Sequence, residues 1–584
     1  MHSRLPSALA LIVFIAAFVS LQHLQLSVSD MRLSVNGGAE QAVQLPYTLK
    51  SSGKELLTFE STLHRNPLSA SKLKIIPDDC ITSVSINGRP LNMAAIPNRC
   101  NWSKGVEIDL ESYLHSGENT LQIVIRKKDG VGGLNVFGLT EQTNGATLLF
   151  ALAALFSLGY LVIALTREQL GGTISILLAA GVILQFHYLS YTDFSTRTFD
   201  LLISTGHLDY IKMIAHDFAL PNPTEGWEYH QPPLYYLAAA IIYVFFEALP
   251  LIDPMVALQL FSLLLFTLFL YYSLHTLKLL ITDEKLLALS ALLLIFWPSG
   301  VIHSIRIGND ILFFTLFALG VNQIVRWQLH NASFRPVLLV ASLALITKAN
   351  GIILFGVIGI LLLIDLYRRR DIKTFGRLTA QSILFFIAAF AVNFADNIYY
   401  ALAQGSQDWL VSNVVNTLNK KLFVANEAFN YLYFDLQTYL KAPFINPWDD
   451  QYGRQFFWNY LFKSALFSEF FFPAKAAVAS VMGALSLLIF GYIVTGMLSA
   501  KPTRGALIMA LVLLLSLAAL LLYRIKIPVA CNTDFRYIYP VIIPMAFFFA
   551  QAQSFFKARR LPALYYGGYV IALLFCIGTV AVFL

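Results

Sequence analysis

Acidic and histidine side chains gather between hydrophobic segments in residues 193–236. The carboxylates are Asp193, Asp200, Asp209, Asp217, Glu225 and Glu228, and the histidines are His207, His216 and His230. Ionisable groups this dense beside a lipid bilayer are costly unless water or chemistry uses them. Carboxylates and imidazoles are also the side chains that most often act as general acids and bases. We therefore expect this stretch to be the active-site loop of a membrane-embedded enzyme.

A second group of candidate residues is basic and lies at the ends of apolar segments on the expected outer side. Its members are Arg306, Lys348, Arg524, Lys526 and Arg536. Basic residues in outer connections oppose the usual orientation bias of membrane proteins, so we expect something to compensate their charge. An anionic ligand is one candidate, because arginine contacts phosphate in a bidentate way and lysine as a point charge. The alternative is salt bridging with Asp310, Asp534 or lipid headgroups.

The elements that must position these residues are transmembrane helices. The chain has 584 residues, 57% of them hydrophobic and 13% charged, with a mean hydropathy of +0.64. This composition predicts a polytopic α-helical membrane protein. About thirteen spans are expected, at 8–26, 144–166, 173–191, 255–277, 286–302, 311–327, 335–347, 350–366, 378–401, 474–498, 505–523, 540–556 and 562–582. The first lies within residues 1–29 and is expected to be an uncleaved signal anchor.

The orientation follows from the turns rich in lysine and arginine. An inner N-terminus places most of these turns in the cytoplasm, so the net charge of +7 does not indicate nucleic-acid binding. This arrangement requires that residues 234–249 form an in-plane or re-entrant helix on the outer side. The alternative is a short tilted crossing with a compensating miscount elsewhere. Residues 192–254 and 402–473 are then outer loops. The aromatic residues of the second loop either cover the substrates or form an interfacial belt.

Residues 30–140 differ in kind from the rest of the chain. Short segments of alternating polarity, such as ITSVSING and NTLQIVIRKK, are separated by turn signals and predict an extracytoplasmic β-sandwich. The phrase VEIDLESYLHSGENTLQIVI resembles those of jelly-roll, galactose-binding-like modules. Cys80 and Cys100 both fall in this region, where they either form a disulfide or remain two free thiols.

Several motifs resemble those of GT-C glycosyltransferases, the membrane enzymes that include protein O-mannosyltransferases and aminoarabinose transferases. TRTFD and GHLDYIKMIAHDFALPNPTEGWEYHQPPLYY look like the first outer loop of this superfamily. WPSGVIHSIRIGNDILF, ITKANGI, NYLFKSALFSEF and DFRYIYPVIIP look like later landmarks of bacterial members. The resemblance covers about 173–550, within an expected GT-C-like domain at 141–584. Two features depart from it: the N-terminal anchor with its β module, and the longer spacing from Asp200 to His207.

The resemblance implies an inverting transfer of a sugar from a polyprenyl-phosphate donor to an acceptor hydroxyl of a glycan, lipid or protein. The reaction would occur on the outer face of the inner (cytoplasmic) membrane. Asp200 ends the TRTFD phrase and is the expected base, with Asp193 as the alternate. Asp310 is the second acidic candidate, either functional or simply paired with Arg306.

Further residues are expected to bind substrate. His207 and His230 would line the pocket, or serve only as structural hydrogen-bonding residues. Arg306, Lys348, Arg536 and Tyr537 are expected to contact the donor. The spacing of the three loop histidines matches no compact metal motif, so no cofactor is assigned and a divalent metal remains an alternative. The competing interpretations are a transporter or flippase of lipid-linked sugars and a non-catalytic scaffold presenting the β module.

Overall fold

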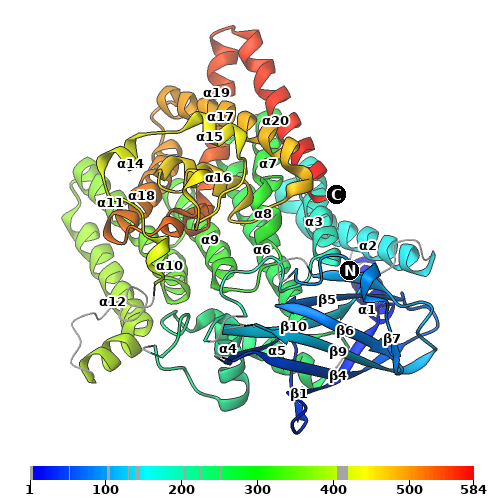
Figure 1. Cartoon of the computed structure of the whole chain (residues 1–584). Helices are drawn as coiled ribbons and strands as arrows, with labels where there is room; N and C mark the ends of the chain where they lie inside the picture. Colours follow the sequence, from blue (N-terminus) through cyan, green and yellow to red (C-terminus); the bar gives the residue numbers. More distant parts are fainter. Residues whose placement is uncertain are drawn as a thin grey trace. The chain divides into compact units, whose positions relative to one another are not determined.

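The computed structural model describes residues 4–51, 53–101, 105–128, 130–139, 145–202, 205–223, 225–249, 251–403 and 418–584. The chain divides into two compact units (Figure 1). The first comprises residues 1–161 and 191–196, and the second comprises residues 162–190 and 197–584. Each unit is described by itself below.

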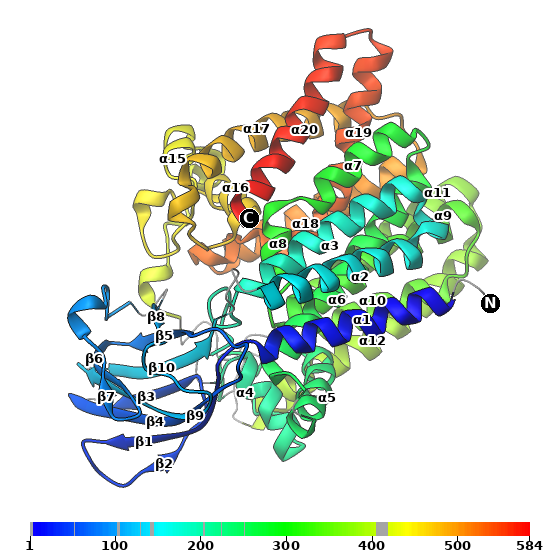
Figure 2. The same cartoon turned by 90° about the vertical axis from the view of Figure 1, so that its right-hand side faces the viewer.

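The first unit contains two antiparallel sheets, preceded by helix α1 (Arg4–His23). The six-stranded sheet has the order β2-β1-β4-β9-β6-β7, and the four-stranded sheet has the order β3-β10-β5-β8 (Figure 2). The strands are β1 (Ser27–Val35), β2 (Gln41–Ala42), β3 (Tyr47–Ser51), β4 (Glu55–Arg65), β5 (Lys72–Asp78), β6 (Cys80–Ile86), β7 (Arg89–Pro90), β8 (Val106–Asp109), β9 (Gly117–Lys127) and β10 (Gly130–Gly138).

The two sheets enclose one hydrophobic core. Alternate residues of β4 and β9, such as Phe59 and Ile123, face Ile75 of β5 and Val136 of β10 in a single buried cluster. The period-two pattern in the sequence therefore produces a two-layer β domain.

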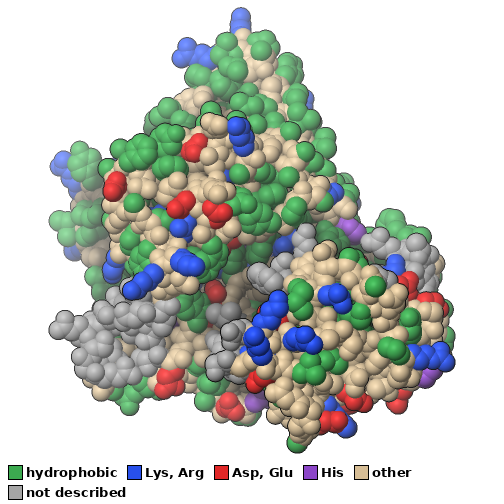
Figure 3. Space-filling view, in the orientation of Figure 1, with side chains coloured by type: hydrophobic (Ala, Val, Ile, Leu, Met, Phe, Trp, Pro, Cys, Tyr) green, Lys and Arg blue, Asp and Glu red, His purple; other side chains and the backbone are tan. Residues whose placement is uncertain are grey.

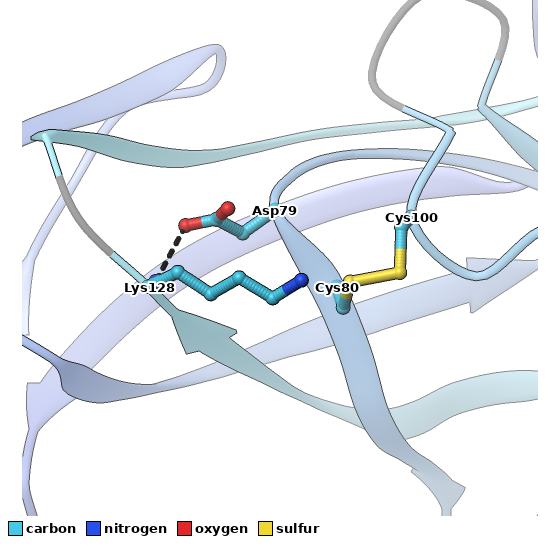
Figure 4. Close-up of a disulfide and its surroundings, with 4 residues drawn as sticks. All are labelled: Asp79, Cys80, Cys100 and Lys128. Atoms are coloured by element: carbon cyan, nitrogen blue, oxygen red, sulfur yellow. Dashed lines mark hydrogen bonds between the residues drawn. A yellow bond between two sulfur atoms is a disulfide. The ribbon is translucent and has the colours of Figure 1, made fainter.

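A disulfide joins Cys80, the first residue of β6, to Cys100 in the loop before β8 (Figure 4). Beside it, the backbone N–H of Lys128 donates to Oδ2 of Asp79 at 2.8 Å. Of the two alternatives left by the sequence, the structure contains the disulfide. Cys531 and Cys576 are free thiols.

Helix α2 (Gly145–Leu170) crosses the boundary between the units, and the second unit is otherwise built mainly from helices. Its other long helices are α3 (Gly172–Tyr191), α6 (Pro254–Leu280), α9 (Asn309–His330), α11 (Ile352–Arg369), α12 (Ile372–Ala403), α17 (Ala476–Ser499), α18 (Arg504–Lys526), α19 (Ile542–Ala558) and α20 (Pro562–Phe583). Shorter helices are α4 (His207–Lys212), α5 (Leu234–Ala248), α7 (Glu284–Ile295), α8 (Pro298–His303), α10 (Arg335–Thr347), α14 (Ala428–Leu432), α15 (Leu436–Lys441), α16 (Phe457–Phe467) and the 3₁₀ segment η8 (Phe535–Val541).

Eleven helices in the described residues are long and apolar enough to cross a membrane. Large apolar side chains are exposed along them, including those of Leu363, Ile383, Leu498 and Ile577. Figure 3 shows such hydrophobic side chains on the surface of the helices. The chain is thus a polytopic α-helical membrane protein with a β domain, as the sequence predicts.

The structure differs from the expected thirteen spans at two places. The segment expected at 286–302 is divided at Trp297 and Pro298 into α7 and α8, because proline cannot continue the hydrogen-bonded ladder of the preceding helix. The segment expected at 335–347 is α10, a helix of 13 residues. At 1.5 Å per residue, neither α7 nor α10 matches a hydrocarbon core of about 30 Å. Helix α5 has 15 residues, and its placement in the plane of the membrane remains a prediction.

Candidate active site

The carboxylate of Asp310 is the centre of a buried ionic cluster. Nζ of Lys348 hydrogen-bonds to its Oδ1. Nη2 of Arg306 and Nη1 of Arg536 each lie 3.9 Å from its Oδ2. The four side chains are between 6% and 12% exposed. Arg306, Lys348 and Arg536 therefore converge on a protein carboxylate, which is the salt-bridging alternative that the sequence left open. Their contact with the donor remains a prediction.

Breaks between helices position these four residues. Asp310 lies in the first turn of α9, and Arg306 lies in the connection from α8 to α9. Lys348 separates α10 from α11 with an extended backbone, and Arg536 lies in η8 just before α19. The connections are tied together, because Nδ2 of Asn350 donates to the carbonyl of Tyr537 at 2.7 Å. Charged side chains at three separate helix ends are thereby held at one place.

Two further basic residues at the expected outer ends are placed differently. Arg524 is buried and donates to the backbone carbonyls of Val529 and Gln455, which makes it a structural residue of the α18–η8 connection. Lys526 is exposed at the end of α18. Three of the five basic residues singled out in the sequence thus meet at Asp310.

Phe199 and Asp200 lie against this cluster. The guanidinium carbons of Arg536 and Arg306 lie 4.0 and 4.2 Å from the centre of the Phe199 ring, which is cation–π geometry. Asp200 follows with φ of +52°, and its carbonyl accepts the backbone N–H of His207 at 2.9 Å. The half-buried Asp200 carboxylate makes no hydrogen bond or ion pair with any other described residue. Within the described part of the chain, it is thus a carboxylate without a direct partner, beside a cationic cluster.

His207 belongs to a buried network next to Asp200. Its Nδ1 lies 2.7 Å from the hydroxyl of Tyr236 and 3.7 Å from Oε2 of Glu228. Burial lowers the pKa of His207 to about 3. Burial, together with the negative charge of Asp200, raises the pKa of Glu228 well above its usual range. His207 is therefore neutral at pH 7, and its contact with Tyr236 is a structural hydrogen bond. Oε2 of Glu228 is buried and has no hydrogen-bond partner among the described residues.

His230 connects the active-site loop to the start of α9. Its Nδ1 donates to the carbonyl of Trp227 at 2.9 Å, and its Nε2 accepts from Gln231 at 3.2 Å. Oε1 of Gln231 accepts from Asn309, the neighbour of Asp310, at 2.9 Å. Burial lowers the pKa of His230 to about 4. The imidazole is thus neutral and fixed in one tautomer.

Asp534, Glu469 and Tyr537 complete the surroundings of Arg536. Oδ2 of Asp534 lies 3.6 Å from Nε of Arg536, and its Oδ1 accepts the backbone N–H of the same arginine. Nη2 of Arg536 donates to the hydroxyl of Tyr537 at 3.2 Å. Tyr460 donates to Glu469, whose pKa is raised to about 8 by burial and by the charge of Asp534.

Asp193, the alternate base, belongs to the first unit. Its Oδ1 accepts the backbone N–H of Ser195 at 2.8 Å and also contacts the Ser195 hydroxyl. The other candidate residues all belong to the second unit. No group of three or more histidine, cysteine or acidic side chains with metal-binding geometry occurs among the described residues.

Sequence reasoning assigned no role to Phe199, His303 or Glu469, and it did not place Glu228 beside His207. His303 accepts from Nη1 of Arg306, three residues further along the chain, and it also contacts Ser468. Ser468 is 165 positions away, and no local pattern indicates that contact. Phe199 is the exception, because it immediately precedes Asp200 in TRTFD. Its position beside the expected base was a signal for a role in the site.

No protein-family model and no curated protein sequence matches the chain. A comparison with solved structures finds ArnT from Cupriavidus metallidurans, in a crystal structure bound to undecaprenyl phosphate. That structure has 12% sequence identity and a TM-score of 0.31, with coverage of 67% of this chain and 80% of ArnT. The apo crystal structure of the same ArnT has 11% identity and a TM-score of 0.31, with coverage of 65% and 76%. A similarity at this level assigns no function to this chain.

Proposed function

We propose that the chain is an inverting glycosyltransferase of the GT-C type, which moves a sugar from a polyprenyl-phosphate donor to an acceptor hydroxyl on the outer face of the inner membrane. One observation carries the proposal. The carboxylate of Asp200, which ends a phrase resembling that of the superfamily, has no hydrogen-bond or ion-pair partner among the described residues and lies beside a buried cluster of three cations. A transfer in which phosphate is the leaving group needs a base that takes the proton of the attacking hydroxyl. It also needs positive charge near the departing phosphate.

The chemistry assigns a separate role to each group. Asp200 accepts the proton of the acceptor hydroxyl while the hydroxyl oxygen attacks the anomeric carbon. The bond from this carbon to the phosphate oxygen breaks, and its electron pair stays on the phosphate. Arg306, Lys348 and Arg536 stabilise the resulting negative charge. Nε of Arg306 is buried without a hydrogen-bond partner among the described residues, so this guanidinium retains a donor for a ligand.

Asp310 holds the three cations in place in this mechanism. A single buried carboxylate shared by three cations leaves each of them incompletely paired, so an entering phosphate gains contacts without displacing the whole cluster. His207, His230 and Tyr537 shape the same site, His207 and His230 through the networks that fix the active-site loop and Tyr537 through its contact with Arg536.

The test is transfer by the purified Asp200→Asn variant in detergent or nanodiscs. We expect loss of about 10²–10⁴-fold in rate, typical for removal of a general base. Donor binding and thermal stability should remain near those of the unmodified protein. Asp217→Asn is the matched control, because it removes one exposed carboxylate from the same loop and should transfer normally. Transfer at the unmodified rate by Asp200→Asn would refute the assignment, and Asp193→Asn would then be tested.

A further inference from the structure

A cleft lies at the end of α9 that is farthest from Asp310. It has a volume of about 420 Å³ and is formed by the end of α9, the end of α11 and the start of α12. The residues used below are Trp327, Gln328, Asp365, Arg369, Asp371 and Arg377. Trp327 is 17 residues beyond Asp310, so the rise of an α-helix separates the cleft from the ionic cluster by about 25 Å. This distance approaches the thickness of a hydrocarbon core, so the cleft belongs to the opposite membrane surface.

The acidic side chains of this cleft already have protein partners. Oδ1 of Asp365 accepts from Nη2 of Arg504 at 2.6 Å, and its Oδ2 accepts from Gln328 at 3.2 Å. Asp371 accepts the backbone N–H of Thr374 at 3.0 Å and so caps the start of α12. The hydrogen bonds from Thr374 lower the pKa of Asp371, which stays ionised in this role. Asp365 is therefore already paired with Arg504 and Gln328, whereas Asp371 acts on Arg377 through its charge alone, without a contact between the two side chains.

Two arginines of the cleft remain without such partners. Arg369 and Arg377 are exposed and make no hydrogen bond or ion pair with another residue in the described ranges. Behind them, Arg504 has a side chain that is 13% exposed, and its Nη1 atom is buried without a hydrogen-bond partner in the same ranges. Among the described residues, the cleft thus carries two guanidinium groups without a direct contact, and the nearby Nη1 of Arg504 has no hydrogen-bond acceptor.

Apolar side chains form the remaining walls. The Trp327 ring lies 4.6 Å from that of Phe334, and Leu362, Leu366 and Phe375 also line the cleft. Tryptophan favours the boundary between headgroups and acyl chains. A ligand that satisfies both walls has an anionic group for the arginines and an apolar part for the leucines and aromatic rings.

We propose that this cleft binds a phosphate group, with Arg369 and Arg377 as its direct contacts. The two sources of that chemistry are an anionic phospholipid headgroup and a free phosphate. Guanidinium groups bind phosphate through paired charge-assisted hydrogen bonds, and basic pockets between transmembrane helices bind anionic headgroups. The site does not depend on the proposed glycosyl transfer.

The test is native mass spectrometry of the full chain incubated with phosphatidylglycerol, phosphatidylcholine or inorganic phosphate. We expect retention of phosphatidylglycerol over phosphatidylcholine, and about tenfold or greater weakening in Arg369→Gln/Arg377→Gln, because two charge-assisted contacts are lost. The matched control is Arg368→Gln/Lys373→Gln, which removes two charges from the same turn outside the cleft and should retain the lipid normally.

Each outcome decides between a built site and diffuse attraction. Equal weakening in the two double variants would mean that the basic turn attracts anions without a specific cleft, and this would overturn the proposal. A further outcome is that the protein binds inorganic phosphate and shows no preference for phosphatidylglycerol. If only Arg369→Gln/Arg377→Gln then abolishes phosphate binding, the result would support the site and identify a soluble ligand. Unchanged thermal stability of both variants excludes unfolding as the cause.

Discussion

His303 accepts a hydrogen bond from Arg306, with Nη1 of the guanidinium 2.8 Å from Nδ1 of the imidazole. Arginine can only donate, so Nδ1 is unprotonated and the proton is on Nε2, which donates to the Ser468 hydroxyl at 3.3 Å. Burial and the charge of Arg306 lower the pKa of His303 well below its usual range, which keeps this tautomer neutral. The chain just before α17, at Ser468, is therefore linked to a cation of the ionic cluster.

This link predicts that His303 positions Arg306. His303→Ala leaves a buried guanidinium donor without its acceptor, at a cost of about 1–3 kcal/mol in stability. The donor KM should rise while kcat falls less, and His303→Gln should restore part of the affinity because its side-chain oxygen can accept. Thermal unfolding and steady-state kinetics measure both effects. His275→Ala is the control, since His275 pairs with Asn322 near the other end of α9. An unchanged KM in His303→Ala would contradict the role.

Asp310 and Asp200 should differ in what their loss does. Asp310→Asn removes the shared partner of Lys348, Arg306 and Arg536, so we expect destabilisation of about 3–5 kcal/mol. Asp200→Asn should change stability by less than about 0.5 kcal/mol. Unfolding in detergent by heat measures both variants. Asp310→Asn/Lys348→Met should recover part of the loss, because it removes a cation that the first change leaves unpaired. Normal stability of Asp310→Asn would show that the cluster does not depend on this carboxylate.

Arg536 is expected to contribute most to donor binding, because it contacts Asp310, Tyr537 and the Phe199 ring. Charged hydrogen bonds are worth about 1.5–3 kcal/mol, so Arg536→Ala should raise the donor Kd by roughly ten- to a hundredfold. Arg536→Lys should restore only part of this affinity, since lysine lacks the bidentate geometry. Titration with the polyprenyl-phosphate donor in nanodiscs measures the effect, with exposed Lys526→Ala as the control. Donor affinity equal to that of the unmodified protein in both Arg536 variants would make the residue structural.

Glu469 predicts a pH dependence of stability. Its pKa in the folded chain is raised from 4.5 to about 8, so the folded state binds a proton that the unfolded state releases above pH 4.5. The contribution of Glu469 to the free energy of unfolding is fully present below about pH 4.5, and it is lost as the pH rises towards 8. Glu469→Gln cannot ionise, so its stability should fall less over that range. Unfolding temperatures measured at several pH values in both proteins test this. If the unfolding temperature depends on pH in the same way in both proteins, the pKa of Glu469 is not raised.

The Cys80–Cys100 disulfide should stabilise the β domain. It closes a loop with a sequence separation of 20 residues, and the loop-closure model assigns about 3 kcal/mol to a loop of this size. Replacement of both cysteines by serine should lower the unfolding temperature of this domain. Reduction of the unmodified protein should produce a similar shift and should have no effect on the double variant. An equal shift in the double variant would mean that the reductant acts elsewhere.

The sequence was sufficient to predict the fold class, and the five basic residues that it singled out include the three that meet at Asp310. Long apolar runs define helices, alternating polarity defines strands, and the topology bias identified Arg306, Lys348 and Arg536 as residues that needed an anion. That anion is at least partly Asp310, which the sequence offered only as one of two alternatives. The catalytic and binding roles of these residues remain predictions.

Other parts of the site depend on contacts between distant segments. The approach of His303 to Ser468 joins residues 165 positions apart, and no local periodicity encodes it. The division of 286–302 was foreshadowed by Pro298, but hydropathy alone joins α7 and α8. The position of Glu228 beside His207 could not be read from the sequence, because residues 193–236 contain three histidines and only the fold brings one of them within 3.7 Å of Glu228.

The left-handed backbone of Asp200 restricts which amino acids position 200 can carry. At φ of +52°, asparagine and glycine are accommodated at low cost, whereas β-branched residues are strained. Few substitutions at position 200 therefore preserve the backbone. Asparagine can replace aspartate without changing the backbone conformation. Glutamate would move the carboxylate, because its side chain is longer by one methylene group. A descendant that lost transfer activity while keeping its fold would be expected to carry asparagine or glycine at position 200.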